Sequence, residues 1–295
     1  MTQTVPIPTR AKEKAGALDA NAKTSLPSYR FLGIRVNPLT IPELNLKIAE
    51  AIARDERWII ANHNLRSVCL FRKDAKFRSF FELAKYIHVD GMSVVYLGRL
   101  LGFPLKTWHR VTYADWLSPL LADAARLKWR VFYLGSRPGV AERGAAILRH
   151  VHPGLQMETA HGYFDTRKES AENGGILSRI NTYQPNILLV GMGMPRQEFW
   201  VLDNLQRIRA NAILTAGATM DYVVGAIATP PRWAGRFGIE WIFRLVDEPG
   251  RLWRRYLIEP LTLVGPVSAE LAKTYSRRAF RRFVSRAASA SEEVE

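Results

Sequence analysis

The chain has 295 residues, 47% of them hydrophobic, which is typical of a folded protein with a substantial core. Lys and Arg outnumber Asp and Glu by 42 to 27, a formal net charge of +15. Such a charge predicts an acidic partner: nucleic acid, anionic lipid or a phosphorylated substrate. The single cysteine, Cys69, excludes an internal disulfide framework and a multi-cysteine metal site, and it suits a reducing cytoplasm.

The amino-terminal residues 1–27 are polar and small, and they lack the continuous apolar core of a signal peptide. They predict a disordered leader. No apolar segment reaches the roughly 20 residues that span a bilayer. The best candidate, Leu261–Leu271, is short and contains Gly, Pro and Glu. If a membrane matters to this protein, the sequence predicts that the protein lies on its surface.

One pattern recurs along the middle of the chain: a short apolar run stops at a small or polar residue, and a helical pattern follows. Near-continuous apolar strands that alternate with helices predict a Rossmann-like parallel sheet with helices on both faces. Ligands bind at the carboxyl ends of such strands. The five runs stop at Asn62–Asn64, Asp90–Gly91, Gly135–Ser136, Gly191–Gly193 and Gly217–Ala218. Helical patterns cover 65–84, 139–151 and 196–209.

Asp90 has two interpretations. Asp-Gly is a common hairpin turn, so Asp90-Gly91 after the run Tyr86–Val89 could simply reverse the chain. However, residues 92–101 have the apolar spacing of a helix that ends at Gly102 and Pro104. A strand followed by a helix instead places Asp90 at the carboxyl end of a parallel strand, which favours a role in binding or chemistry.

The glycine-rich strand ends permit anion binding but do not prove it. Gly191 and Gly193 open like a dinucleotide-binding fingerprint, yet the third glycine is missing, so a tight strand-to-helix connection explains them equally well. Free backbone N–H groups at a helix start would still favour a diphosphate. The sequence has no Asp-x-Asp, His-Glu-x-x-His, Walker or Gly-x-Ser-x-Gly motif.

The carboxyl-terminal part concentrates positive charge. Pro230-Pro231 marks a boundary, and twelve Lys and Arg face five Asp and Glu between Arg232 and Arg286. On a helix, Lys273, Arg277 and Arg281 would form one row. Upstream, aromatic residues interleave with arginines. A basic helix with aromatics predicts docking to an anionic membrane interface.

Three stretches together resemble the WecG/TagA/CpsF family of bacterial glycosyltransferases (glycosyltransferase family 26). They are VDGMSVVYLGRLLG with RVTYADW, PNILLVGMGMPRQEFW and GIEWIFRLVDEPGRLWRRY, and the resemblance runs from about Phe31 to about Leu263. The resemblance implies an inverting, metal-independent transfer from a UDP-sugar to a sugar on a polyprenyl diphosphate, in bacterial surface polysaccharide synthesis. The enzyme would be peripheral to the cytoplasmic face of the membrane, without a cofactor.

The boundary at Pro230-Pro231 divides the chain into a Rossmann-like catalytic domain at 28–230 and a membrane-docking helical appendage at 231–286, and residues 287–295 predict a disordered tail. The resemblance places the catalytic aspartate on Asp90 and the family glutamine on Gln197. Asn62 stands where the family has threonine, and Tyr113 where a glycine is usual. The expected substrate-binding residues are Asn62, Asn64, Arg110, Thr112, Gly135, Gly191, Gly193, Gly217, Asp221, Arg244, Arg251 and Arg254.

Several roles stay open at the level of sequence. Gln197 could orient a sugar hydroxyl or cap backbone at a helix start, and Asp221 could bind substrate or be a first-turn acid favoured by the helix dipole. A carboxylate at Asp90 can serve as the base for an inverting transfer. The sugar is a hexose for an exopolysaccharide in the preferred interpretation and N-acetylmannosamine or its uronic acid in the alternative.

Two other functional classes compete. A nucleotide-dependent oxidoreductase needs a complete glycine fingerprint and an acidic residue about 20 positions on, and neither is present. A nucleic-acid-binding protein would explain the charge alone. The family resemblance favours the transferase, with no nucleic acid as partner.

Overall fold

The computed structural model describes residues 26–227 and 232–276, without the side chains of Arg232, Arg236 and Arg251. The predicted leader falls almost wholly, and the predicted tail wholly, outside these residues. The predicted boundary at Pro230-Pro231 and the arginine rows from Arg277 to Arg286 also lie outside them.

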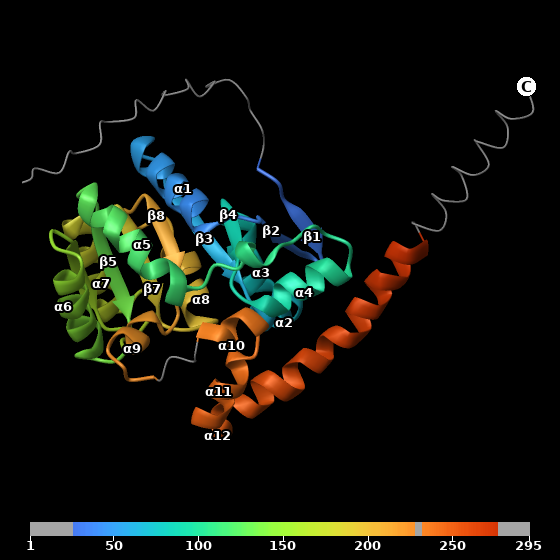
Figure 1. The fold of residues 1–295 in the computed structure, drawn as a ribbon. Helices are drawn as coiled ribbons and strands as arrows, with labels where there is room; N and C mark the ends of the chain where they lie inside the picture. Colours follow the sequence, from blue (N-terminus) through green and yellow to red (C-terminus); the bar gives the residue numbers. More distant parts are fainter. Residues whose placement is uncertain (1–25, 228–231, 277–295) are drawn as a thin grey trace, which may run out of the picture.

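A six-stranded parallel sheet forms the centre of the protein, with the strand order β4-β3-β8-β7-β5-β6 (Figure 1). The α/β fold predicted from the sequence is therefore confirmed. All pairings in this sheet are parallel, so every strand ends at the same edge. The strands are β3 (Trp58–His63), β4 (Tyr86–Val89), β5 (Arg130–Gly135), β6 (Gln156–Ala160), β7 (Ile187–Gly191) and β8 (Ala212–Thr215).

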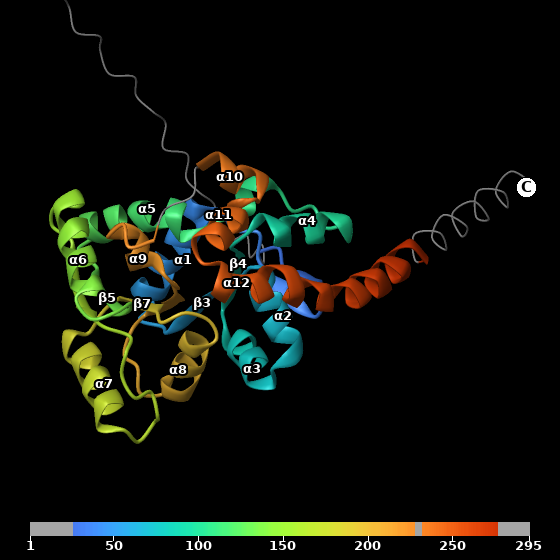
Figure 2. The ribbon, with the colours of Figure 1, turned by 90° about the horizontal axis from the view of Figure 1, so that it is seen from below.

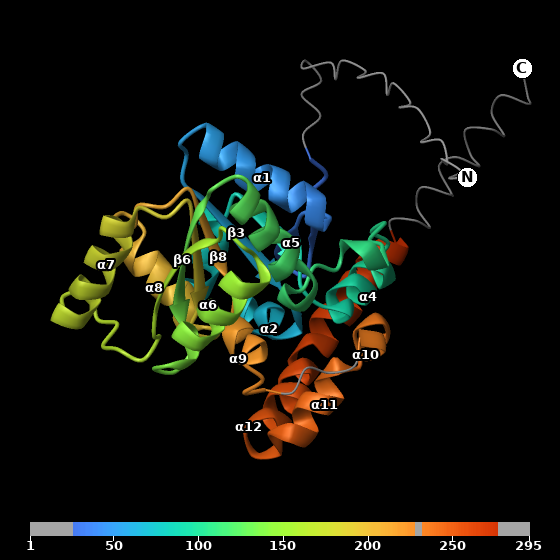
Figure 3. The same cartoon turned by 60° about the vertical axis from the view of Figure 1, so that its left-hand side comes forward.

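Helices cover both faces of the sheet, as Figure 3 shows. Alternate strand residues point into two separate cores: Leu189 and Leu214 into one, Leu188 and Ile213 into the other. The first face carries α1 (Ile41–Ala53), α5 (Tyr113–Arg126), α6 (Val140–Val151) and α9 (Thr219–Val223). The second carries α3 (Ala75–Leu83), α7 (Ala171–Tyr183) and α8 (Arg196–Asn204).

A third core lies at the β4 end of the protein. An antiparallel hairpin of β1 (Tyr29–Phe31) and β2 (Ile34–Val36) packs there with α2 (Leu65–Lys73) and α4 (Met92–Leu100). α4 begins two residues after Asp90, so the helix interpretation of this stretch is confirmed and the hairpin turn is not formed. A 3₁₀ turn, η1 (Thr107–His109), leads on towards α5.

The sequence prediction missed or misjudged several elements, among them β6, the β1–β2 hairpin and the helix at 65–84. In β6, exposed Gln156 and Glu158 alternate with buried residues, so this strand lacks the continuous apolar run of the other five. The hairpin strands have three residues each and were too short to recognise. The helix predicted at 65–84 is two helices, because Asp74 ends α2 and caps α3, its carboxylate accepting from Phe77 N at 2.9 Å.

Short helices follow β8 and cross one half of the carboxyl edge. Figure 2 looks at this edge and shows α11 and α12 near β4 and β3, with α10 beside α4, while α9 lies near β5 and β7. They are α10 (Arg232–Phe237), α11 (Glu240–Asp247), α12 (Pro249–Trp253), the π-helix η2 (Arg254–Ile258), the 3₁₀ helix η3 (Glu259–Leu263) and a final helix at 264–276. We call the segment 232–276 the carboxyl-terminal helices.

The carboxyl-terminal helices are anchored to the third core. Leu263 is buried there, with Val267 and Leu271 packed against it. Two polar contacts add to this packing: the thiol of Cys69 on α2 contacts the Glu259 carbonyl oxygen at 3.5 Å, and Leu32 N donates to the Glu270 carboxylate at 2.7 Å. The helix predicted for this segment is present.

Glycines allow three strand ends to meet closely. A Cβ on Gly135 would overlap the backbone of Gly191, and a Cβ on Gly191 would overlap both the Tyr133 hydroxyl and the Gly217 carbonyl. Backbone surrounds these positions, so neighbouring atoms have little freedom to move away. The tight connection that the sequence offered as one explanation of these glycines is therefore real.

We expect Gly191→Ala to lower the free energy of unfolding by about 1–3 kcal/mol, since the added methyl group overpacks this junction. Chemical denaturation measures the change. The matched control is Gly175→Ala on α7, where a Cβ meets nothing within 4 Å, and where alanine should add about 0.5–1 kcal/mol. Equal stability of Gly191→Ala and wild type would contradict the account of the junction.

Candidate active site

Asp90 stands at the carboxyl end of β4, where the sheet edge meets the carboxyl-terminal helices. Its backbone N–H donates to the carbonyl of His63 at 2.9 Å, which continues the β3–β4 pairing by one residue. The strand end fixes the backbone of Asp90, and α4 starts immediately beyond it. This is the rigid kind of position that parallel sheets offer for ligand-contacting side chains.

The Asp90 carboxyl is set to titrate near neutrality. Burial raises its pKa to about 7, although the positive charges of Arg110 and Arg244 and a hydrogen bond from the Asn64 side chain all act to lower it. The negative charge of Glu240 adds a small upward effect. A carboxyl group with a pKa near the working pH suits proton transfer.

Arg110 connects the core domain to α11. Its guanidinium donates to Glu240 at 2.7 Å and approaches the Asp115 carboxylate at 3.4 Å. A Cβ on Gly235 of α10 would overlap both partners of the Arg110–Glu240 pair. Thr112 donates its hydroxyl to Asp115 at 3.0 Å. Arg110 therefore lies close enough to Asp90 to influence its charge, whereas the Thr112 hydroxyl is engaged by Asp115.

The two asparagines after β3 have different surroundings. Asn62 is buried, and its side-chain N–H donates to the Thr215 carbonyl at 2.9 Å, so it ties β3 to β8. Asn64 caps α2 by accepting from Ser67 N at 3.1 Å, and its side chain also hydrogen-bonds Asp90. Asn64 therefore belongs to the immediate surroundings of Asp90, while Asn62 supports the strand ends.

Gln197 holds two glycine loops together. Its side-chain oxygen accepts from Gly193 N at 3.2 Å and from Gly217 N at 3.1 Å, and its side-chain N–H donates to Glu198 at 2.8 Å. With 2% of its surface exposed, Gln197 is enclosed. Of the two roles left open by the sequence, this geometry is that of the backbone cap. It also occupies two of the N–H groups that we expected to meet a diphosphate.

Asp221 and Ser136 form a second polar cluster at the carboxyl edge of the sheet. The Ser136 hydroxyl donates to Asp221 at 2.9 Å and lies 3.0 Å from the Tyr133 hydroxyl. Ser136 adopts a φ of 57°, which is uncommon for a residue other than glycine. The carboxylate of Asp221 beside Gly135 and Gly217 makes this half of the edge suited to hydroxyl groups rather than to a diphosphate.

Positive charge gathers on the other half of the edge, among Arg66 of α2, Arg244 of α11 and Arg255 of η2. Burial above all lowers the pKa of Arg255 to about 10, with further lowering by the charges of Arg66 and Arg244. The Nε atoms of Arg66, Arg110 and Arg255 are buried without a hydrogen-bond partner. Arg66 lies 3.7 Å from the Glu259 carboxylate. An anion here would relieve repulsion and satisfy donors together.

Of the other two expected arginines, only Arg254 has a described side chain, and it does not join this group. Arg254 is exposed, with its guanidinium 5.3 Å from the Trp253 ring centroid. The side chain of Arg251 lies outside the described residues. Arg244, by contrast, sits 5.1 Å from the Tyr222 ring centroid and close enough to Asp90 to influence its charge.

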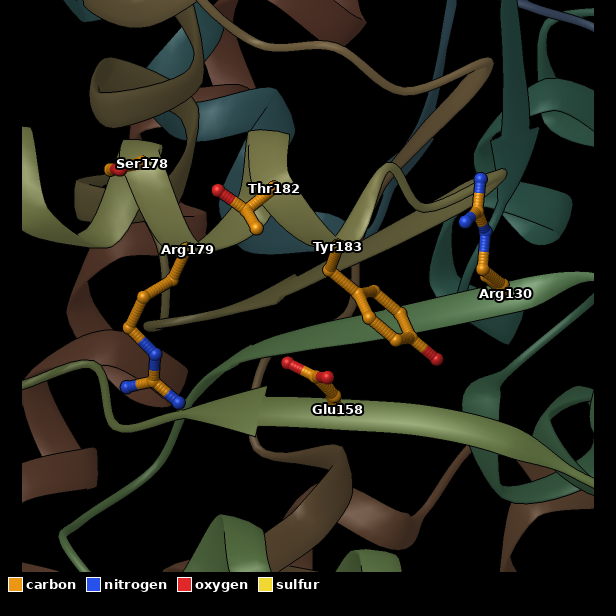
Figure 4. A pocket seen from close by; sticks show the side chains of 6 residues that line it. All are labelled: Arg130, Glu158, Ser178, Arg179, Thr182 and Tyr183. Atoms are coloured by element: carbon orange, nitrogen blue, oxygen red, sulfur yellow. The ribbon is translucent and has the colours of Figure 1, made fainter.

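A separate pocket of about 410 Å³ lies away from the site. Figure 4 shows its lining, which comes from β5, β6 and α7: Arg130, Glu158, Ser178, Arg179, Thr182 and Tyr183. Arg130 is the first residue of β5, so the pocket reaches the amino end of the strands. None of the residues predicted for the site lines it.

Within 26–227 and 232–276, no three His, Cys, Asp or Glu side chains come together in a way that could hold a metal ion. No helix in the same ranges combines the length and apolar character needed to cross a membrane.

Comparison with known proteins identifies the family. The glycosyl transferase WecG/TagA/CpsF family matches residues 29–277. The chain belongs to this family. Curated relatives include N-acetylglucosaminyldiphosphoundecaprenol N-acetyl-β-D-mannosaminyltransferase of Staphylococcus aureus strains NCTC 8325 and COL, each 30% identical over 228 residues, covering 76% of this chain and 85% of the relative. The strain MW2 protein is 29% identical over 226 residues.

This WecG/TagA/CpsF protein is therefore a glycosyltransferase, as the sequence predicted. The sequence prediction nevertheless missed Arg66, Arg255 and Glu240 as neighbours of the site. Arg66 could have been suspected, since it comes two residues after the strand-end cluster at Asn62–Asn64. The other two depend on how the carboxyl-terminal helices approach Asp90, which no local pattern reveals.

The raised pKa of Glu198 can be tested through the pH dependence of stability. Burial raises its pKa to about 7 against the hydrogen bond from Gln197 and the charge of Arg66. A carboxyl group whose folded pKa is raised stabilises the fold at low pH, and this stability is lost as the pH rises through about 7. We therefore expect Glu198→Gln to melt a few degrees higher than wild type at pH 8, with no difference at pH 5.

Thermal melting between pH 5 and pH 8 measures this effect. The exposed residue Glu82 provides the matched control, because Glu82→Gln should show no pH-dependent difference from wild type. A Glu198→Gln protein that melts lower than wild type at pH 8 would show that ionised Glu198 stabilises the site instead.

Proposed function

We propose that this enzyme moves a sugar, with inversion, from a UDP-sugar to a sugar carried on a polyprenyl diphosphate, and that Asp90 is the general base. The observation that carries the proposal is the strand-end carboxyl of Asp90, with its pKa of about 7, beside a cluster of half-buried arginines. The names of the relatives, which include an N-acetylglucosaminyldiphosphoundecaprenol acceptor, support the acceptor class.

In the proposed step the acceptor hydroxyl oxygen attacks the anomeric carbon of the donor sugar. The bond between that carbon and the UDP oxygen breaks, and its electron pair leaves with UDP. The hydroxyl proton passes to the Asp90 carboxylate, which must be ionised to accept it. The rate should therefore rise with pH through about 7, the pKa of Asp90.

Positive groups on the β3–β4 half of the edge would stabilise the leaving diphosphate. Arg66, Arg244 and Arg255 converge there, and Arg66 and Arg255 retain unpaired Nε donors. Guanidinium groups bind phosphate oxygens in pairs of hydrogen bonds, which makes them effective at this task. Arg251 and Arg254 remain candidates for the lipid-linked diphosphate.

The opposite half of the edge would hold uncharged hydroxyl groups of the substrate. Asp221 and Ser136 supply acceptors and a donor there, and Gly135, Gly191 and Gly217 let a ligand approach the backbone closely. In this proposal Gln197 is a positioning residue, since its amide fixes the loops of Gly193 and Gly217.

We include in the proposal that transfer needs no divalent metal. The guanidinium groups supply positive charge where the leaving group forms, and the sequence lacks the Asp-x-Asp motif. Transfer measured in EDTA should then keep its rate. Loss of activity in EDTA that magnesium or manganese restores would contradict this part.

The donor sugar is the finer part of the proposal. We propose a hexose for an exopolysaccharide, with N-acetylmannosamine, the sugar in the names of the relatives, as the alternative. Tyr113 fills space beside Asp90, which supports a pocket shaped differently from those of relatives with glycine there. Transfer assays with a panel of UDP-sugars, including UDP-glucose and UDP-N-acetylmannosamine, decide between them.

The exposed side chains of the carboxyl-terminal helices support attachment to a membrane surface at the cytoplasmic face. Apolar side chains that point to solvent follow one another along this segment, and α11 is strongly amphipathic. Such a face beside basic residues fits an anionic bilayer interface. The exposed apolar residues are Trp233, Phe237, Trp241, Ile242, Val246, Trp253, Leu257, Ile258, Leu261 and Val264.

Asp90→Asn should fold normally and lose roughly 10²–10⁴ in turnover, because the amide cannot accept the proton. Radiolabelled sugar transfer to a lipid-linked acceptor measures the loss. The control is Asp203→Asn on α8, whose carboxylate pairs with Lys76 at the surface, and which should keep its rate. Wild-type turnover of Asp90→Asn, or its failure to fold, would reject the assignment.

Phe237→Ser with Val246→Ser should weaken sedimentation with phosphatidylglycerol vesicles about tenfold or more, because two apolar side chains no longer enter the interface. These residues are 68% and 73% exposed, so folding should not suffer. Leu46→Ser is the matched control: it is 67% exposed on α1, away from the carboxyl-terminal helices.

Transfer to a short, water-soluble acceptor should be unchanged in the double variant. If vesicle binding is also unchanged, the surface has no membrane role. If the wild-type protein binds random RNA and ignores anionic vesicles, the nucleic-acid alternative replaces the membrane proposal.

A further inference from the structure

Tyr113 is placed beside Asp90 by the backbone. The residues before it continue the sheet edge: Val111 N donates to the Val89 carbonyl at 2.8 Å, and Arg110 forms a parallel bridge with Val89. Tyr113 is then the first residue of α5. The end of β4 and the start of α5 therefore lie side by side, and Asp90 is close enough to Tyr113 to influence its pKa.

The Tyr113 hydroxyl is buried and has no hydrogen-bond partner. Only 9% of the residue is exposed, and its ring packs against Trp116 with 5.4 Å between centroids. Burying a hydroxyl without a partner destabilises a protein, whereas phenylalanine would make the same ring contacts without that penalty. Packing therefore explains the ring but not the oxygen.

Tyr133 offers an instructive contrast on the same face of the sheet. Its hydroxyl is also buried, but it lies 3.0 Å from the Ser136 hydroxyl and donates to the Gly217 carbonyl at 3.5 Å. A tyrosine in this core can thus be satisfied. The unsatisfied tyrosine is the one adjacent to the carboxyl group that carries the proposed chemistry.

We propose that Tyr113 is a positioning residue for Asp90, whose hydroxyl donates a hydrogen bond to the Asp90 carboxylate when that group is ionised. The bond would aim the carboxylate and favour its charged form. This inference rests on the proposed function for its catalytic meaning. The contact between the two side chains can be tested without any substrate.

The charged and titratable groups around the pair are few. Asp90 faces Asn64 from the cap of α2, Arg110 from the segment before α5, and Arg244 and Glu240 from α11. On the other side, the ring of Trp116 separates Tyr113 from His88 of β4, with 5.2 Å between the His88 and Trp116 centroids. Arg110 and Arg244 remain in a Tyr113 variant, so they do not mimic the loss of the hydroxyl.

Tyr113 remains a donor at every working pH. Burial raises the pKa of its hydroxyl well above the usual value, and the negative charge of Asp90 and the proximity of Tyr133 raise it further. The hydroxyl therefore keeps its proton while Asp90 ionises. Removing this donor should raise the pKa of Asp90, because the charged form loses a stabilising partner.

The experiment compares Tyr113→Phe with wild type in two measurements. A ¹³C NMR titration of the Asp90 carboxyl, assigned through Asp90→Asn, should move its midpoint up by about one pH unit, the size of one tenfold change in a proton equilibrium. The acidic limb of kcat/KM should move by the same amount. Transfer should fall about tenfold at pH 6 and lie within about twofold of wild type at pH 9.

The remote pocket provides the matched control. Tyr183 lies there beside Glu158, and burial and that carboxylate raise the pKa of its hydroxyl (Figure 4). Tyr183→Phe should leave the Asp90 titration and the pH profile unchanged. At pH 5, where Asp90 is protonated, the melting temperature of Tyr113→Phe should equal or exceed that of wild type, since an unpaired hydroxyl is removed.

An unchanged Asp90 titration in Tyr113→Phe overturns the proposal. So does a loss of transfer that is equal at pH 6 and pH 9, which would indicate contact with the sugar, or a lower melting temperature at pH 5, which would indicate a structural role. Wild-type activity of Asp90→Asn would reject the proposed base instead, while the NMR titration would still decide whether Tyr113 acts on Asp90.

Discussion

The site depends on positive charge brought to a buried carboxyl group by a segment distant in sequence. Burial alone would drive Asp90 further towards its neutral form, and Arg110 and Arg244 oppose that effect. Arg110 is in turn held by Glu240 of α11. The carboxyl-terminal helices therefore do more than cover the sheet edge, because the ionisation of Asp90 depends on their position.

The strand ends divide the edge into two chemical halves. The glycine junction of β5, β7 and β8 carries the carboxylate of Asp221 and the side chain of Gln197, whose oxygen accepts from backbone N–H groups within the protein. The β3–β4 half holds Arg66, Arg244 and Arg255. A substrate with an anionic diphosphate and neutral sugars matches this division, which is why glycine loops alone gave an incomplete account of anion binding.

The sequence predicted the sheet because five of its strands are buried on both faces and read as continuous apolar runs. It predicted that Asp90 lies at a strand end because the helix pattern after Gly91 favours a strand followed by a helix over a reversal of the chain. It missed β6, because Gln156 and Glu158 of this strand are exposed to solvent and interrupt the apolar run. The sequence could not predict the contacts of Gln197 and Tyr113, because each depends on two loops or elements that meet only in the folded chain.

The single thiol of the protein, that of Cys69, lies at the contact between α2 and the carboxyl-terminal helices. Cys69 is buried under η3, with its sulfur against the Glu259 carbonyl, and burial raises the pKa of the thiol. As long as the carboxyl-terminal helices rest on α2, this sulfur is shielded and slow to react. Movement of these helices away from α2 would expose the sulfur. The rate at which Cys69 is alkylated therefore reports how often the carboxyl-terminal helices leave the sheet edge.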